Sequence, residues 1–179
     1  MSTHRTYVLQ PDRLRRLAFF RTLAPPEIRR LAQIGATQHY ADGDFLATEG
    51  TRKQRRVLYV ILRGELQYLK RVRGARAKVV LTLHAGEVGG FLTFFNEGPS
   101  PVSVRCVGRT AVFEIGRREL QLLAGEHPQL GIKVLLALVQ DAVRRLETFV
   151  ERSAATSAWA LDLESLLQTL PLRGEMKEG

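Results

Sequence analysis

Leu83-His84-Ala85-Gly86-Glu87-Val88-Gly89-Gly90 is the most informative part of this sequence, together with Ser100-Pro101-Val102-Ser103-Val104-Arg105-Cys106, which follows it closely. The first stretch begins where a strand-like segment, 78–83, ends. The second alternates apolar and polar residues from Val102 onward, which is typical of a strand. Gly86 supplies a turn. The two stretches therefore predict a compact, glycine-containing connection between two strands.

The region around this connection has the pattern of many short strands. Between Gln38 and Ile115 the hydrophobic period shortens from that of a helix to that of a strand. Val57 to Leu62 is predicted to be a strand that Gly64 interrupts, and 111–115 is predicted to be the last one. Glycines at positions 43, 50, 64, 74, 86 and 108 supply turns. Such a pattern favours an antiparallel sandwich or barrel.

Helical patterns lie on both sides of the strands. The predicted fold class is therefore α+β, an antiparallel β-barrel (a double-stranded β-helix or jelly roll) with N-terminal helices and a long C-terminal dimerisation helix. From Leu14 to Gly35 the period is helical, with Leu14, Leu17 and Ala18 on one face. A second helix is predicted to begin at Pro25-Pro26, because a proline in the first turn costs no hydrogen bond, and to end at Gly35. After the strands, a short helical element with three leucines is predicted to end at Gly125.

A long helix is predicted to begin at Pro128. Apolar residues recur along it in alternating steps of three and four, which is the spacing of a heptad seam. An adjacent stripe repeats at seven. One stripe can pack on the strands while the other meets a second chain, or both can form one broad face against the chain's own core. The first alternative predicts a homodimer, with an interface formed by Leu135, Val139, Ala142, Leu146 and Phe149.

The small polar run 153–157 is predicted to end this helix. Residues 158–170 could then form one more short helix, carrying Trp159, before Pro171 and a flexible tail. The predicted domains are accordingly 14–152 for the main fold and 153–179 for the short helix and tail.

The charge is strongly basic, with 27 Lys and Arg against 18 Asp and Glu, a formal net charge of +9. Of the basic residues 22 are arginines. Such a preference for arginine can reflect an arginine-rich proteome rather than a function of this chain. One basic cluster is 52–56, and another, 70–78, is predicted to be a hairpin tip. Through Arg71, Arg73 and Arg76 this tip could attract nucleic acid or an anionic membrane, or it could simply be a solvated loop.

Nothing in the sequence indicates an enzyme. The four histidines are scattered without metal-ligand spacing, and no nucleophile elbow, phosphate-binding P-loop or catalytic carboxylate pair is found. Cys106 is expected to be a buried, inert thiol. With no signal-peptide pattern, no apolar run long enough to span a membrane and one cysteine, the expected location is the cytoplasm.

The order of helices, strands and long helix resembles the cyclic-nucleotide-binding domain of the catabolite activator protein superfamily, over 14–152. The matching stretches are 20–23 with 31–32, 43–50, 59–66 and 83–90. The resemblance makes residues 83–106 a phosphate-binding cassette. In the family a cyclic phosphate lies at the N-terminus of a short helix in the cassette, where backbone N–H groups favour an anion. A glutamate there contacts the ribose, and an arginine pairs with the phosphate.

This chain departs from the family at both charged positions. If the family's Phe-Gly-Glu aligns with 88–90, the glutamate is replaced by Gly90. If its Arg-Ser-Ala aligns with 100–102, the arginine is replaced by Ser100, or by Pro99 or Pro101 if the register slips, and none of these is cationic. The resemblance implies a degenerate ligand pocket formed by Gly89, Gly90, Phe91, Leu92, Ser100, Pro101 and Val102. Losing both contacts would remove about 3–6 kcal/mol, or about two to four decades of affinity.

The expected function is a non-catalytic regulatory module that acts as a dimer through protein contacts and does not bind cyclic AMP or cyclic GMP in the usual way. No cofactor or metal is predicted, and the partner protein is not identified by the sequence. One alternative is a sensor of a cyclic mono- or dinucleotide that is held differently. Another is a sequence-independent nucleic-acid or membrane binder using the basic hairpin. Family activators place a winged helix-turn-helix after the long helix, and the 27 residues after Arg152 are too few for one.

Overall fold

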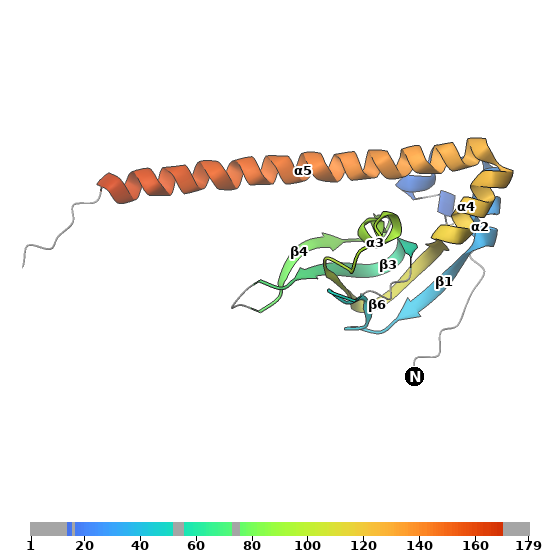
Figure 1. Cartoon of the computed structure of the whole chain (residues 1–179), viewed down its shortest axis with the longest axis horizontal. Coiled ribbons are helices and arrows are strands. Elements are labelled where there is room, and N and C mark those ends of the chain that lie inside the picture. Colours follow the sequence, from blue (N-terminus) through green and yellow to red (C-terminus); the bar gives the residue numbers. More distant parts are fainter. Residues whose placement is uncertain (1–13, 16, 52–55, 73–75, 170–179) are drawn as a thin grey trace, which may run out of the picture. The chain divides into compact units, whose positions relative to one another are not determined.

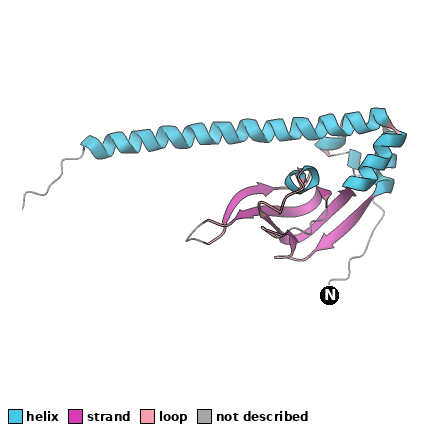
Figure 2. Ribbon diagram, in the orientation of Figure 1, coloured by secondary structure: helices cyan, strands magenta, loops and turns pink. Residues whose placement is uncertain are grey.

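The computed structural model describes residues 14–15, 17–51, 56–72 and 76–169, and for 155–169 it describes the backbone only. The predicted α+β fold is confirmed: an antiparallel sheet is flanked by an N-terminal helix and a long C-terminal helix (Figures 1 and 2). By internal contacts the chain divides into two units, Met1–Leu138 and Val139–Gly179. Arg73, Leu170 and the tail lie outside the described residues.

All six strands belong to one antiparallel sheet. The strands are β1 (Gly35–Tyr40), β2 (Phe45–Ala47), β3 (Val57–Lys70), β4 (Lys78–Leu83), β5 (Val88–Gly89) and β6 (Ser103–Gly116). The order across the sheet is β1-β6-β3-β4, while β2 also pairs with β6 and β5 with β3 (Figure 1). The two long strands β3 and β6 therefore form the centre of the fold, and every other strand pairs with one of them.

Strand β3 changes the face that it presents along its length. Before Arg63 its odd-numbered residues lie in one buried cluster, and after Gly64 the even-numbered residues Leu66 and Tyr68 lie in that same cluster. The pairing with β6 shifts register at this point, and Gly64 has a φ of 83°. A bulge of this kind inverts the alternation of side chains. The strand therefore continues through Gly64 with its aromatic residues on one side.

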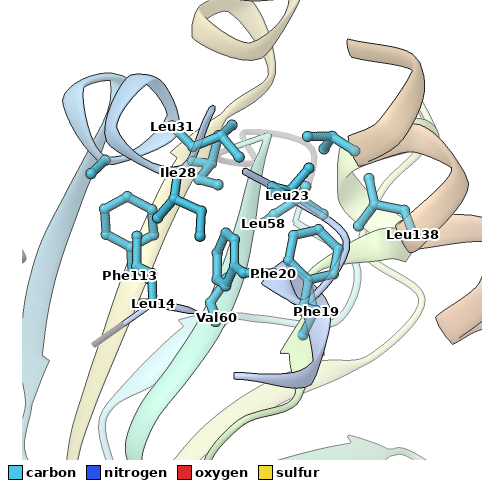
Figure 3. Packing of buried hydrophobic residues seen from close by; sticks show 14 of the residues in the cluster. Leu14, Phe19, Phe20, Leu23, Ile28, Leu31, Leu58, Val60, Phe113 and Leu138 are labelled. Atoms are coloured by element: carbon cyan, nitrogen blue, oxygen red, sulfur yellow. The ribbon is translucent and has the colours of Figure 1, made fainter. Parts of the chain in front are cut away.

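Two apolar clusters lie against the sheet. The inner cluster, as we call it, is formed mainly by β3, β6 and the cassette: Val57, Tyr59, Ile61, Leu66, Tyr68, Leu83, Val102, Val104, Cys106 and Val112. The helix-side cluster joins the opposite residues of β3 and β6, such as Leu58 and Phe113, to the helices (Figure 3). Phe19 and Phe20, in the short 3-10 helix η1 (Ala18–Phe20), belong to the helix-side cluster and pack edge to face, 5.0 Å apart.

Helix α2 (Pro25–Ile34) begins at the predicted proline, and the Glu27 carboxylate accepts the N–H of Ala24 at 2.7 Å. It ends before Gly35 as predicted, but for a different reason. Gly35 is extended, with a φ of −110°, and it starts β1. A Cβ at this position would meet the Phe113 ring and would lie 2.7 Å from the Glu114 carbonyl oxygen. Glycine is needed here for close approach of β1 to β6.

Two boundary predictions before helix α5 are wrong. The segments 102–106 and 111–115 are parts of one strand, β6. Helix α4 (Arg117–Glu126) passes through Gly125, because a single glycine costs a helix only about 1 kcal/mol and Pro128 follows close behind.

Helix α5 runs without interruption over Pro128–Thr169. The run 153–157 contains neither proline nor glycine. Alanine is the best helix former, and serine and threonine each cost less than about 0.7 kcal/mol relative to it, so the run does not break the helix. The domain limits 14–152 and 153–179 stay a prediction. The side chain of Trp159 lies outside the described part.

Candidate functional site

The turn of the cassette is fixed to the central strand β3. Gly86, with a φ of 95°, donates its N–H to the Ile61 carbonyl at 2.8 Å, and the Ile61 N–H donates to the Glu87 carbonyl at 3.0 Å. The Glu87 carboxylate also accepts the His84 N–H at 2.6 Å. The hydrogen bonds of Gly86 and Glu87 to Ile61 fix the position of the turn relative to strand β3.

Gly90 is the residue at which strand β5 becomes helix α3 (Phe91–Phe95). It is the N-cap of α3 with a φ of 93°, and its carbonyl accepts the Phe94 N–H at 2.9 Å. A Cβ on Gly90 would contact the Val57 carbonyl oxygen and lie 3.3 Å from the Leu58 Cα. Both the backbone conformation and the space exclude a side chain, so position 90 requires glycine.

This requirement favours another alignment of the glutamate position. A glutamate at 90 would have an unfavourable φ and would contact the backbone of β3. If the glycine of the family's Phe-Gly-Glu is placed at Gly90 instead, the glutamate position falls at Phe91, the first residue of α3. Phe91 is half-buried and packs on the helix-side cluster. In either register this position carries no carboxylate.

A tyrosine from β3 lies directly against the cassette. The Tyr68 hydroxyl accepts the N–H of Gly90 at 3.0 Å, and a Cβ on Gly89 would meet the same hydroxyl. Tyr68 is 6% exposed and Tyr59, which pairs with Gly89 in register, is 2% exposed. The inner side of the cassette is therefore in contact with the chain's own aromatic residues, and the amide at the start of α3 already has a partner.

Ser100 is fully engaged with its neighbours. It is 2% exposed, and its hydroxyl donates to the Val102 carbonyl at 2.7 Å. Its N–H donates to the Thr51 carbonyl at 3.1 Å, while its carbonyl accepts the Gly50 N–H at 2.8 Å. The residue fastens the end of the cassette to the loop after β2, and it carries no charge that could meet a phosphate.

A lysine stands beside this end of the cassette. Lys70 Nζ lies 2.7 Å from the Pro101 carbonyl oxygen and 2.7 Å from a carboxylate oxygen of Glu49. Glu49 also accepts the Arg71 N–H at 2.9 Å. The hydrogen bond from Lys70 is the main cause that lowers the pKa of Glu49, and the Arg71 N–H adds to it. The cation nearest to Pro101 is thus already paired with an acid.

The other predicted site residues are placed as follows. Leu92 is half exposed on α3, while Val102 is buried in the inner cluster. Arg105 is half-buried between Val104 and Cys106, which both face the inner cluster, and its guanidinium donates to Gln67 at 2.8 Å. The alternation of side chains along β6 therefore places Arg105 on the face opposite to Val104 and Cys106.

The sequence reasoning missed Tyr59, Tyr68 and the pair of Lys70 with Glu49 as parts of the site. The sequence signal for the two tyrosines is the alternation of side chains between the two faces of β3. The bulge at Gly64 reverses this alternation before Tyr68. Without that shift Tyr59 and Tyr68 would be assigned to opposite faces. Lys70 was noted only as part of a basic hairpin.

Three other possibilities arise for the described residues: a reactive thiol, a metal site and a membrane-spanning helix. Cys106 is completely buried, and desolvation raises the pKa of its thiol to about 12, so it is unreactive. No group of three His, Cys, Asp or Glu residues in the described ranges is arranged to hold a metal ion. Likewise, none of the helices described has a stretch apolar and long enough to cross a bilayer.

The fold combines an antiparallel sheet, which holds a short helix-containing cassette, with a long C-terminal helix, and solved structures share this fold. A cyclic nucleotide-binding domain from Methylobacillus flagellatus KT superposes with a TM-score of 0.70 at 23% identity, covering 93% of this chain and 84% of that one. The catabolite activator protein of Thermus thermophilus gives a TM-score of 0.62 at 24% identity, over 85% and 72% of the two chains.

A third structure is the regulatory subunit of a cAMP-independent protein kinase A from Trypanosoma brucei. Its TM-score is 0.58 at 23% identity, covering 72% of this chain and 45% of that one. These identities show a shared fold. No curated protein matches the sequence.

The sequence itself matches the family described as cyclic nucleotide-binding domain over residues 37–127, which is half of the chain. This protein belongs to the cyclic nucleotide-binding domain family. Domains of this family are typically regulatory modules without catalytic activity.

Proposed function

We propose that this chain is a regulatory domain that keeps the cyclic nucleotide-binding fold without the usual binding of cyclic AMP or cyclic GMP. The observation that carries the proposal is the hydrogen bond from the Gly90 N–H to the Tyr68 hydroxyl, 3.0 Å long. The family resemblance places the amides at the start of this short helix at a cyclic phosphate, and one of them, that of Gly90, is here bonded to the protein itself. A nucleotide would have to displace a buried phenol before it could reach this group.

The missing charges make that displacement unfavourable. A bond between a neutral amide and a hydroxyl contributes only about 0.5–1.5 kcal/mol, so Tyr68 alone would not exclude a strongly held ligand. Because position 100 carries no arginine and position 91 no glutamate, a cyclic nucleotide loses about 3–6 kcal/mol of binding free energy. The balance therefore favours the phenol, and affinity for ordinary cyclic nucleotides falls by about two to four decades.

A thermal-shift screen over cyclic mono- and dinucleotides, followed by calorimetry, tests this proposal. Cyclic AMP and cyclic GMP are expected to leave the unfolding temperature unchanged and to give no saturable heat. Binding of either nucleotide at micromolar concentration or below would overturn it. Binding of a cyclic dinucleotide alone would instead favour a sensor that holds its ligand differently, and Lys70 could contact such a ligand only by leaving Glu49 and the Pro101 carbonyl.

We further propose that the chain acts as a homodimer through α5. The predicted interface residues are exposed in the single chain: Leu135 50%, Val139 50%, Leu146 60% and Phe149 66%, with Ala142 also exposed. Their steps of four and three match a heptad seam, which favours a second copy of the same helix as the partner. A stripe of this length is rare on the surface of a monomer.

Sedimentation equilibrium tests the dimer. The parent chain is expected to sediment at twice its mass of 20.1 kDa, and Leu146→Glu at that mass itself. Thr148→Glu is the matched control, because 100° per residue places Thr148 on the opposite side of the helix from the seam. A monomeric parent, or dissociation by both variants alike, would contradict the interface.

The basic hairpin supports a second candidate function, attraction to an anionic surface. Arg71, Arg76 and Lys78 are exposed, and so are Val79 and Val80 on the edge strand β4. Basic and apolar side chains mixed in this way suit an anionic membrane. Salt-dependent binding to anionic vesicles that is lost in an Arg71→Glu, Arg76→Glu variant would support this function, and its absence would leave the hairpin a solvated loop.

A further inference from the structure

An apolar cavity of about 320 Å³ lies among helices α3, α4 and the first turns of α5, within the first unit of the chain. Its lining is mostly hydrophobic: Phe94, Phe95, Leu120, Ala124, Leu135 and Leu138. Gly131 lets α4 and α5 approach here, since a Cβ on it would lie 2.6 Å from the Ala124 Cβ. The cavity is thus built into the junction at which the long helix begins, and it is separate from the inner cluster.

One charged side chain stands in the wall of this cavity. Arg117 is the first residue of α4, and its N–H donates to the Arg56 carbonyl at 2.8 Å. Its guanidinium nitrogen Nη1 is buried and has no hydrogen-bond partner among the residues that the structure describes. Arginine stays charged in proteins, and a buried guanidinium nitrogen without an acceptor is costly. A cation in the first turn of a helix also opposes the helix dipole.

An anion would supply both the acceptor that this nitrogen lacks and the opposite charge. The same side chain also borders a neighbouring cavity of about 420 Å³ with Arg56 and Arg118, but that lining includes the carboxylate of Glu119. Arg56 is in addition 3.4 Å from Glu97. An anion that meets Arg117 from the apolar side avoids Glu119, which lines the neighbouring cavity only. The apolar lining then selects a ligand with a hydrophobic body.

We propose that this cavity binds a small carboxylic acid with an apolar body, its carboxylate on Arg117 and its body against Phe94 and Leu138. The volume is at the lower end of the range of about 300–1,000 Å³ for small-molecule sites, which fits one aromatic ring or a short alkyl chain. A planar guanidinium can donate two bonds to one carboxylate. Because the walls come from both sides of the α4–α5 junction, the bound acid stabilises the position of the first turns of α5.

Calorimetry with the full chain tests the proposal, using phenylacetate and the uncharged phenylacetamide as a matched pair. Phenylacetate is expected to bind saturably, and phenylacetamide at least tenfold more weakly, since a hydrogen bond to a charged group is lost. Arg117→Gln should weaken phenylacetate binding by about tenfold or more. Arg117→Lys, which keeps the charge but not the fork, should lie between that variant and the parent.

Two further variants locate the site. Arg118→Gln removes a charge from the neighbouring cavity only and should leave phenylacetate binding unchanged. Ala124→Leu should abolish binding by filling the apolar cavity, with the circular dichroism spectrum of the parent as the check that it folds.

Several results would overturn the proposal. The first is the absence of saturable binding of phenylacetate, benzoate and hexanoate at millimolar concentration, and the second is equal binding of acid and amide. Equal loss in Arg117→Gln and Arg118→Gln would assign the anion to the neighbouring cavity. Binding by the Leu146→Glu variant but not by the parent would show that a second copy covers the cavity. None of these results bears on cyclic nucleotides. The last one does bear on the proposed dimer, because Leu135 belongs both to the predicted interface and to the lining of the cavity.

Discussion

Replacing Gly90 with alanine is expected to destabilise the fold strongly, although only one methyl group is added. The left-handed conformation of this residue, with its φ of 93°, costs a residue with a side chain about 1–2 kcal/mol. The Cβ would also contact the Val57 carbonyl oxygen, which belongs to the backbone of the central strand and cannot rotate away. Overpacking of this kind costs about 1–3 kcal/mol. The sum, about 2–5 kcal/mol, corresponds to a fall in Tm of roughly 5–15 °C for a chain of this size.

Thermal unfolding followed by circular dichroism measures this loss, and Gly43→Ala separates its two causes. Gly43 has a φ of 82°, but a Cβ there would have nothing within 4 Å. Gly43→Ala should therefore show the conformational cost alone, about 1–2 kcal/mol. Gly98→Ala, at a glycine without positive φ or close neighbours, should unfold near the parent. If Gly90→Ala were no worse than Gly43→Ala, position 90 would have room for a side chain, and the assignment of the glutamate position to Phe91 would be wrong.

Further predictions concern the bonds around the site. Tyr68→Phe leaves the buried Gly90 N–H without an acceptor and should cost about 1–3 kcal/mol in urea denaturation, whereas an unchanged midpoint would mean that the bond to Tyr68 contributes nothing. The lowered pKa values of Glu27, bonded to Lys133, and of Glu49 mean that both stabilise the fold above the ordinary pKa of glutamate and lose this effect as the pH falls through their lowered values. A double variant Glu27→Gln, Glu49→Gln should therefore show a shallower loss of Tm below about pH 4, and an unaltered slope would contradict the two ion pairs. Cys106 should react with a thiol reagent only as fast as the chain unfolds, because it is buried with a pKa of about 12, and rapid labelling of the native protein would refute its burial.

Much of the fold follows from the sequence because its periods are local. Strand β4 has the predicted bounds, 78–83, and Val104 and Cys106 alternate as predicted. Pro25 and Pro128 mark helix starts because their missing N–H groups are tolerated only there. In contrast, residues 153–157 differ from the flanking residues only slightly in helix propensity. The sequence therefore could not show whether the helix continues through them or ends there.

The details of the site depended on contacts between distant segments. Three glycines in close succession, Gly86, Gly89 and Gly90, leave the register of the cassette open until a positive φ and the carbonyl of Val57 single out one of them. The position of Tyr68 depends on the bulge at Gly64, where a Cβ would lie 2.9 Å from the Thr110 Cα. Neither fact has a local signal, since each arises from packing of β3 against another segment.

The proposed function rests on the phenol of Tyr68, rather than a cyclic phosphate, as the partner of the Gly90 amide at the start of α3. An NMR titration of the ¹⁵N-labelled full chain with cyclic AMP and cyclic GMP, followed at the amides of Gly86, Gly89 and Gly90, shows whether a nucleotide takes the place of this phenol. None of these resonances is expected to shift saturably at millimolar nucleotide. A saturable shift of the Gly90 amide at micromolar nucleotide would contradict it, because the ligand would then have displaced Tyr68 without the two charged contacts.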